Sequence, residues 1–104
     1  MDIVFTPRFQ KDLKRLPRDH QGVFAKAFTE YIQPALQAAA QTATRVDWPP
    51  KLRAEQLVSS GGICALTWHF ARTDERLTFY LELDGGEVVC VFRRIGTHDI
   101  YHAP

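Results

Sequence analysis

The chain has 104 residues, of which 45% are hydrophobic and 24% are charged, and its formal net charge is +1. This length supports one hydrophobic core and one domain, spanning residues 1–104, and the near-neutral charge excludes a protein whose whole surface binds polyanions. No apolar run reaches the ~18 residues of a membrane span, and no signal-peptide pattern is found, so we expect a cytoplasmic protein without membrane contact.

The N-terminal residues predict a strand followed by a helix. Residues 2–5 form a short strand-like run, and Thr6 and Pro7 have the pattern of an N-cap followed by proline at the first helical position. The helix is expected to end at Pro17, because proline cannot continue it. Its apolar stripe carries Phe9, Leu13 and Leu16, with Arg8, Lys11, Lys14 and Arg15 mostly on the other side.

A second helix is expected to follow immediately. Asp19 can cap it, and apolar residues then recur at helical spacing as far as Ile32. We expect Pro34 to interrupt this helix and the Ala-rich stretch to continue it, with a kink, to about Gln41. Two helices joined this tightly form an antiparallel hairpin.

The middle of the chain loses the helical pattern. Trp48 and the two prolines after it indicate a loop, and Trp48 is expected to pack over the core rather than to stack on a base. Residues 53–58 alternate as a strand, and the Ser-Ser-Gly-Gly run at 59–62 predicts a turn.

The last third predicts three antiparallel strands. With Asp84 and Gly85 as a two-residue turn, Leu81 lies opposite Val88, Phe79 opposite Cys90 and Leu77 opposite Phe92. A loop at 72–75 sets Phe70 opposite Leu77 and Trp68 opposite Phe79. One face of the sheet then becomes continuous core. The fold class is therefore α+β, with the two helices on one face of a mainly antiparallel sheet of four to five strands.

The other face of that sheet is expected to be an open surface with a cationic centre. In this register His69 lies opposite Thr78, and Arg76 lies opposite Arg93. The residues on this face are Thr67, His69, Arg76, Thr78, Tyr80, Glu82, Val89, Val91 and Arg93. His69 is interpreted either as a half-exposed sheet residue or as a base.

The segment that follows Arg93 holds the main candidate site. His98, Asp99, Tyr101 and His102 come within five residues, directly after the apolar last strand. One interpretation is a C-terminal cap held by local hydrogen bonds. The other is that His98 titrates near neutrality while Arg93 stabilises an anion, which suits acid/base work on a phosphodiester.

No pattern of metal ligands or cofactor binding is found. Asp99, Glu82 and the histidines lack a tight ligand spacing. Cys64 and Cys90 lie in apolar strand-like runs and predict neither a disulfide framework nor a zinc site. We therefore expect no metal and no cofactor.

Two motifs, with Trp48 to Leu57 entering the sheet between them, give the chain a resemblance to a known family. These are Lys-Asp-Leu-Lys-Arg-Leu at 11–16 and, more specifically, Arg-Arg-Ile-Gly-Thr-His-Asp-Ile-Tyr at 93–101. In this layout the chain resembles the RelE/ParE superfamily of bacterial toxin–antitoxin toxins, with the closest similarity to the RelE and YafQ branch.

The resemblance implies a metal-independent endoribonuclease that cuts mRNA on the ribosome through a 2′,3′-cyclic phosphate. His98 would be the general acid or base, Arg93 rather than Arg94 would stabilise the phosphate, and Tyr101 would place the substrate. The candidate RNA-binding residues are Lys51, Arg53, Arg76, Tyr80, Arg94 and His102, and His69 is a further catalytic candidate.

The resemblance also implies partners. A cognate antitoxin protein is expected, and the resemblance allows a toxin–antitoxin heterotetramer. ParE-like members share the fold but poison DNA gyrase, so a non-catalytic gyrase binder, or a degenerate binding module, is the alternative.

Overall fold

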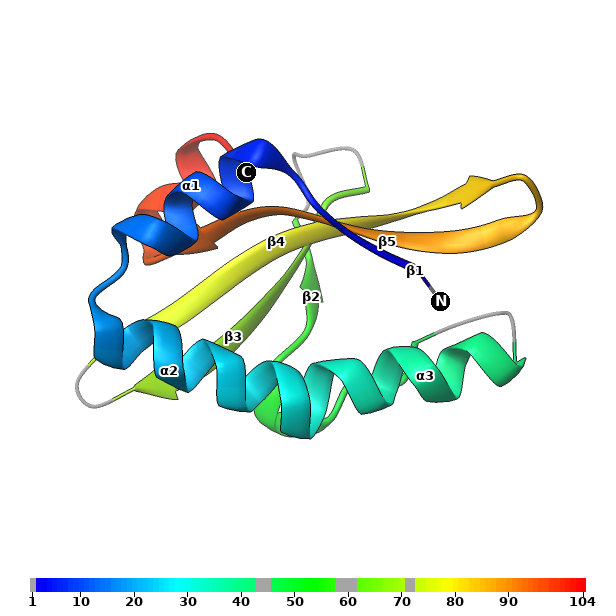
Figure 1. The fold of residues 1–104 in the computed structure, drawn as a ribbon, viewed down its shortest axis with the longest axis horizontal. Coiled ribbons are helices and arrows are strands. Elements are labelled where there is room, and N and C mark those ends of the chain that lie inside the picture. The colour runs from blue at the N-terminus through cyan, green and yellow to red at the C-terminus, as the bar shows by residue number, and fades with distance from the viewer. Residues whose placement is uncertain (1, 43–45, 58–61, 71–72) are drawn as a thin grey trace.

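The computed structural model describes residues 2–42, 46–57, 62–70 and 73–104. Its five strands form one sheet in the order β1-β5-β4-β3-β2 (Figure 1). The parallel pair is β1 with β5, and the other neighbours are antiparallel. The strands are β1 (Asp2–Phe5), β2 (Glu55–Gln56), β3 (Cys64–Phe70), β4 (Thr73–Asp84) and β5 (Glu87–Gly96). The α+β prediction is confirmed.

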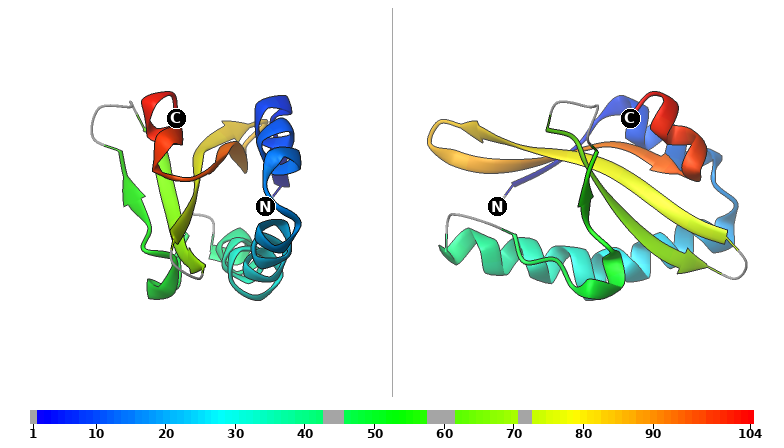
Figure 2. Two further views of the ribbon diagram at one scale, coloured as in Figure 1. Left: turned by 90° about the vertical axis from the view of Figure 1, so that its left-hand side faces the viewer. Right: turned by 180° about the vertical axis from the view of Figure 1, so that it is seen from behind.

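The helices between residues 7 and 42 lie on one side of the sheet, as the left view of Figure 2 shows. In Figure 1 the first helix and the longer helical segment run in opposite directions, as expected for a helical hairpin. Within the described residues, no helix combines the length and apolarity needed to cross a membrane. The helical segments are α1 (Pro7–Arg15), α2 (Arg18–Ala27), the π-helical η1 (Phe28–Ile32), α3 (Gln33–Thr42) and the 3₁₀ turns η2 (Pro50–Leu52) and η3 (His98–His102).

The start of α1 confirms the predicted cap. Thr6 Oγ1 accepts a hydrogen bond from the Phe9 backbone N–H at 3.1 Å, which satisfies one of the free donors of the first turn. The second helix is present, but its predicted cap was wrong, because α2 begins at Arg18 with Pro17 at the N-cap. Asp19 lies inside the first turn, where its carboxylate accepts from the His20 N–H at 3.1 Å.

Pro34 does not break the long helix. The chain widens into the π-helical turn η1 just before it, and the Gln33 N–H donates to the Phe28 carbonyl five residues earlier. Proline lacks a donor and its ring crowds the carbonyl of the preceding turn, so a wider turn accommodates it without ending the helix. The helix therefore continues as α3 along the sheet (Figure 1).

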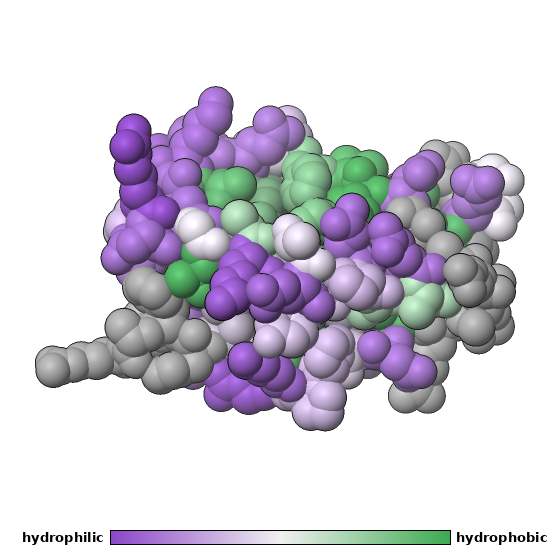
Figure 3. All heavy atoms as spheres, turned by 60° about the horizontal axis from the view of Figure 1, so that its bottom comes forward, coloured by the Kyte–Doolittle hydropathy of each residue, from purple (hydrophilic) through white to green (hydrophobic). Residues whose placement is uncertain are grey.

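The core lies between the sheet and the helices and is rich in aromatic rings. Phe9 of α1 is stacked on Phe92 of β5 with ring centroids 5.6 Å apart, and both are fully buried. Trp48 packs edge-on against Phe79 at 5.2 Å, so its predicted place over the core is confirmed. In Figure 3 hydrophobic side chains gather in a band along the upper part of the view, with hydrophilic ones over most of the rest.

Both predicted hairpin registers were wrong, although the faces they assigned are right. Gly85 and Gly86 form the turn after β4, with φ of 60° and 88°, so that Leu81 pairs with Cys90 and Phe79 with Phe92. As far as Phe92 this shift is an even number of residues, and an even shift leaves these side chains on the same face.

The β3–β4 hairpin is shifted in the same way. β4 already begins at Thr73, so Leu66 rather than Phe70 lies opposite Leu77. His69 therefore pairs with Asp74 instead of Thr78, and Arg76 pairs with Thr67 and Gly96 instead of Arg93.

A bulge in β5 changes the direction of its arginines. Phe79 pairs with Phe92 and Thr78 pairs with Arg94, so Arg93 is the extra residue between them. The predicted strand at 53–58 is also shorter in the structure. Of residues 53–57, Glu55 and Gln56 form β2, and the Leu57 N–H donates to the Ile63 carbonyl at 2.9 Å. Residues 58–61, at the end of the predicted strand and in the predicted turn, lie outside the described residues.

Candidate functional site

Three side chains on the open face of β4 line up along the strand. Arg76, Thr78 and Tyr80 alternate with core residues, which places neighbours about 6.6–6.8 Å apart. Each is in contact with a residue from the C-terminal part of the chain. The Tyr101 ring lies 5.3 Å from the Arg76 guanidinium, and the Arg93 guanidinium lies 5.8 Å from the Tyr80 ring. The predicted open face is therefore covered at its centre.

The covering segment is η3, which turns back over the end of the sheet. Its start depends on Gly96, because a Cβ at that position would lie 2.9 Å from Ile100 Cγ2. Ile100 is buried, and its backbone N–H donates to the Thr97 carbonyl at 3.1 Å. The close approach of Ile100 to the glycine backbone is what brings Tyr101 over Arg76.

Tyr101 joins the strands and the C-terminal segment in one polar group. Its hydroxyl donates to Glu55 Oε1 of β2 at 3.3 Å. Burial raises the pKa of the Tyr101 phenol, a hydrogen bond from Thr67 opposes the rise, and the Glu55 carboxylate adds to it. The phenol therefore stays protonated at neutral pH, beside a carboxylate and a guanidinium. A hydrogen-bond donor, a proton acceptor and a cation are thus gathered within one site.

Asp74 links this group to the edge of the sheet. Its Oδ2 lies 3.0 Å from Arg53 Nη2 and 3.9 Å from Arg76 Nη2. Arg53 adopts the left-handed backbone region, with φ of 44°, which non-glycine residues seldom occupy.

Lys51 Nζ donates to the Tyr31 hydroxyl at 3.2 Å across a cleft of about 530 Å³ between α2 and η2. Lys51 therefore lies toward the helices, whereas Arg53 faces the Arg76 group.

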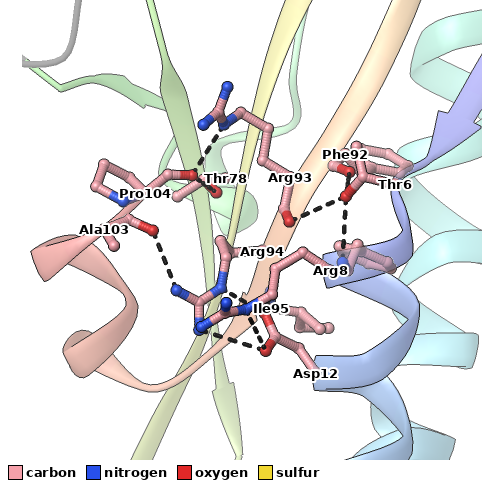
Figure 4. Close-up of polar contacts among 11 residues, drawn as sticks. Thr6, Arg8, Asp12, Thr78, Phe92, Arg93, Arg94, Ile95, Ala103 and Pro104 are labelled. Atoms are coloured by element: carbon pink, nitrogen blue, oxygen red, sulfur yellow. Dashed lines mark hydrogen bonds and ion pairs between the residues drawn. The ribbon is translucent and has the colours of Figure 1, made fainter.

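Arg93 and Arg94 hold the last two residues of the chain (Figure 4). Arg93 Nε donates to the Pro104 backbone oxygen at 3.1 Å, and Thr78 Oγ1 donates to the same oxygen at 2.9 Å. Arg94 Nη1 donates to the Ala103 oxygen at 3.1 Å. A hollow of about 340 Å³ lies beside these contacts, and its lining is Thr6, Arg8, Tyr80, Arg93, Arg94, Ala103 and Pro104.

Arg94 is also held by a residue of α1. Its Nε donates to Asp12 Oδ2 at 2.6 Å, and Asp12 is buried. β1 ends opposite Phe92, so no strand lies beside Arg94 on that side and the side chain reaches the helix around the edge of β5. Arg94 thus contributes to the fold as well as to the candidate site.

The structure brings some of the predicted site residues together and separates others. Arg76 and Tyr101 form one group, and Arg93 and Tyr80 lie further along the same face. His102 is exposed at the end of η3. The side chains of His98 and His69 lie outside the described residues, so their roles stay predictions.

Several residues of the site escaped the sequence analysis. Glu55 lies in a short strand, and its only signal was the alternation of residues 53–58. Thr78 was placed on the right face but not recognised as a donor. Asp12, which is buried with Phe9 on the inner side of α1, gave no signal at all, because its partner Arg94 is 82 residues away.

A buried contact between a histidine and a glutamate, outside the site, was also not predicted. His20 Nδ1 of α2 contacts Glu75 Oε1 of β4, and the Glu75 side chain is only 1% exposed. The other Glu75 oxygen is buried with no hydrogen-bond partner in the described part of the chain. His20 was not among the candidate site residues, since a contact between a helix and a distant strand leaves no local pattern in the sequence.

The described residues show no candidate metal centre. Among them, no three His, Cys, Asp or Glu side chains gather as ligands, and both cysteines are free thiols. The expectation about cofactors stays a prediction.

Comparison with known proteins identifies the fold. No family model and no curated protein sequence matches the chain. Among solved structures, a YoeB/ParE toxin from Agrobacterium tumefaciens is similar, with a TM-score of 0.54 and 16% sequence identity over 94% of this chain and 99% of that one. At this identity the similarity concerns the arrangement of helices and strands, and it agrees with the two-layer architecture described above. The chain therefore shares its fold with this YoeB/ParE toxin, as the resemblance to the RelE/ParE superfamily predicted.

Proposed function

We propose that this protein is the toxin of a type II toxin–antitoxin module and that it cleaves mRNA as an endoribonuclease. The fold shared with a YoeB/ParE toxin supports the first part. The second part is supported by the Arg76–Tyr101–Glu55 group, which places a cation, a neutral phenol and a carboxylate beside the His98 segment. A protein that only binds its target has no need of such an acid/base set.

In this proposal the chain supplies each proton transfer with its own residues. Glu55 accepts the proton of the ribose 2′-hydroxyl, whose oxygen then attacks the adjacent phosphorus. The bond from phosphorus to the 5′ oxygen breaks, and His98 donates a proton to that leaving oxygen. The products are a 2′,3′-cyclic phosphate and a 5′-hydroxyl end. Arg76 and Arg93 stabilise the negative charge on the phosphate in the transition state.

Tyr101 positions these groups rather than transferring a proton. Its hydroxyl holds Glu55, and its ring lies against Arg76. A phenol with a raised pKa keeps its proton at neutral pH, so it can donate this hydrogen bond throughout the reaction. His69, Lys51, Arg53, Tyr80, Arg94 and His102 remain candidates for contacts with the RNA strand.

The remaining partners follow from the same proposal. A free nuclease of this kind harms the cell that makes it, so a cognate antitoxin protein binds and silences it. Ribosome-bound mRNA is the substrate.

The test is induction of the parent and of Arg76→Gln, followed by primer extension on a translated mRNA. The parent should arrest growth and produce cleavage sites, and Arg76→Gln should do neither while melting like the parent. A soluble parent that leaves growth unaffected contradicts the toxin proposal. Growth arrest with intact mRNA and damaged DNA would instead favour a gyrase poison.

A further inference from the structure

The Pro104 backbone oxygen occupies a site that has the form of an anion cradle. Two donors converge on this one oxygen, the Thr78 hydroxyl at 2.9 Å and Arg93 Nε at 3.1 Å. Thr78 is fully buried and belongs to the central part of β4, so its donor is held in a fixed place. Fixed neutral and cationic donors aimed at one oxygen are what a phosphate oxygen requires.

The position of this oxygen relates it to the proposed chemistry. Thr78 lies between Arg76 and Tyr80 on the open face, and Tyr80 carries the Arg93 guanidinium. The Pro104 oxygen is therefore in contact with Arg93 and lies on the strand face that also carries Arg76, the two arginines that the proposed function assigns to the phosphate. The adjoining hollow of about 340 Å³ adds Arg8 and Arg94 to its lining, so the surroundings favour a negative ligand.

Resting on the proposed function, we infer that Thr78 and Arg93 form the binding site for a phosphodiester group of the RNA substrate. Residues 103–104 occupy this site in the free protein and must leave before RNA enters. Thr78 is then a binding residue, and its hydroxyl takes the place of one water ligand of the phosphate oxygen.

The segment competes with RNA in a way that can be measured. When a binding site is open for only a fraction of the time, the apparent affinity falls by that fraction. A segment that occupies the cradle about nine-tenths of the time weakens RNA binding by roughly 10-fold. Removing residues 103–104 should therefore raise the apparent affinity for RNA by the same factor, without adding any new contact.

The experiment measures binding rather than cleavage, so that it does not depend on catalysis. The probe is a short fluorescent RNA with 2′-O-methyl riboses, which cannot form the cyclic phosphate, and inorganic phosphate serves as a competitor at fixed ionic strength. The parent is compared with a chain shortened to end at His102, and melting confirms that the shortened chain is folded. The full-length double variant Ala103→Gly/Pro104→Gly loosens the segment without removing it and covers the case in which the shortened chain is unstable.

The expected result is tighter RNA binding by roughly 10-fold for the shortened chain and a smaller gain for the double variant. In the shortened chain, Thr78→Val and Arg93→Gln should each remove the gain, and Arg18→Gln, an exposed arginine in the first turn of α2, should keep it. Phosphate should compete more effectively against the shortened chain than against the parent.

Two results would overturn the inference. One is equal RNA affinity for the parent, the shortened chain and the double variant. The other is a gain that survives Thr78→Val. If the parent fails to cut RNA while the shortened chain binds RNA more tightly as expected, the proposed function is refuted, but the inference about the Thr78 and Arg93 site is not.

Discussion

Asp12 and Arg94 are in direct contact although 82 residues separate them in the sequence, with Arg94 Nε 2.6 Å from Asp12 Oδ2. The contact is two-pronged, because Arg94 Nη2 donates to Asp12 Oδ1 at 3.3 Å. Asp12 also accepts the Ile95 backbone N–H at 3.3 Å. One buried carboxylate thus joins the first helix to the last strand and to the arginine that holds Ala103.

Replacement of Arg94 should therefore reduce stability. Arg94→Ala removes the nearest cation from the buried Asp12 carboxylate and leaves it beside the exposed Arg8, whose Nε lies 3.7 Å from Asp12 Oδ1. Removing one partner of a buried ion pair typically costs about 3–5 kcal/mol of unfolding free energy. Urea unfolding should show a lower midpoint with an unchanged slope. The matched control is Arg18→Ala, whose exposed side chain should change stability by less than ~0.5 kcal/mol. Equal midpoints for Arg94→Ala and the parent would show that the pair contributes nothing.

Replacement of His98 should affect chemistry and spare the fold. His98→Gln retains hydrogen-bonding capacity but cannot transfer a proton, so cleavage should slow by roughly 10²–10⁴-fold. Its melting temperature should match that of the parent, because position 98 follows the last strand. Single-turnover cleavage of a translated mRNA measures the rate. A variant that cuts mRNA as fast as the parent would remove His98 from the mechanism.

A methyl group added at Gly96 should disturb the site, because η3 packs against this glycine. The added Cβ would lie 2.9 Å from Ile100 Cγ2, so η3 must shift or the buried Ile100 must move. Overpacking of this kind typically costs about 1–3 kcal/mol, and we expect Gly96→Ala to lose cleavage as well because Tyr101 moves with η3. Gly22→Ala is the control, since a Cβ there meets nothing within 4 Å. Full cleavage by a Gly96→Ala protein of normal stability would show that η3 tolerates the shift.

The Cys90 thiol should make the fold sensitive to alkaline pH. Burial, with a smaller contribution from Cys64, raises its pKa from 9.0 to about 12. Since the folded pKa is raised, the stabilisation is complete below about pH 9 and falls by about 1.4 kcal/mol per pH unit as the pH rises toward 12.

Urea unfolding of the parent and of Cys90→Ala at several pH values isolates this contribution. Other groups titrate in the same range, so the measured quantity is the difference between the two proteins. The parent should lose more stability than the variant as the pH rises above about 9. Parallel curves would show that the folded thiol ionises as easily as the unfolded one.

Much of the fold could be predicted because its local signals agree with one another. Thr6 and Pro7 mark the helix start, and the alternation from Cys64 to Phe92 places the strand residues of the main hydrophobic cluster on the correct face. The strand registers could not be predicted as well. Asp84-Gly85 and Gly85-Gly86 are both good two-residue turns, and an even shift between them leaves the apolar face unchanged.

The candidate site was harder to predict than the fold. The motif at 93–101 pointed to the right region, but the partners that organise it come from distant segments. Glu55 meets Tyr101 across 46 residues, and Thr78 meets Pro104 across 26. Such pairs depend on the exact register and on the bulge at Arg93, which leave no periodic pattern in the sequence.

The place of β5 in the sheet has a consequence for synthesis. It is the last of the described strands to be made, yet it lies between β1 and β4. While the ribosome is still making the residues before Glu87, β1 has no strand to pair with and Phe9 lacks its stacking partner Phe92. Because chains emerge N-terminus first, the sheet closes only after β5 has emerged, and Tyr101 reaches Arg76 later still. A nascent chain therefore cannot assemble the Arg76–Tyr101–Glu55 group before Tyr101 has left the ribosome.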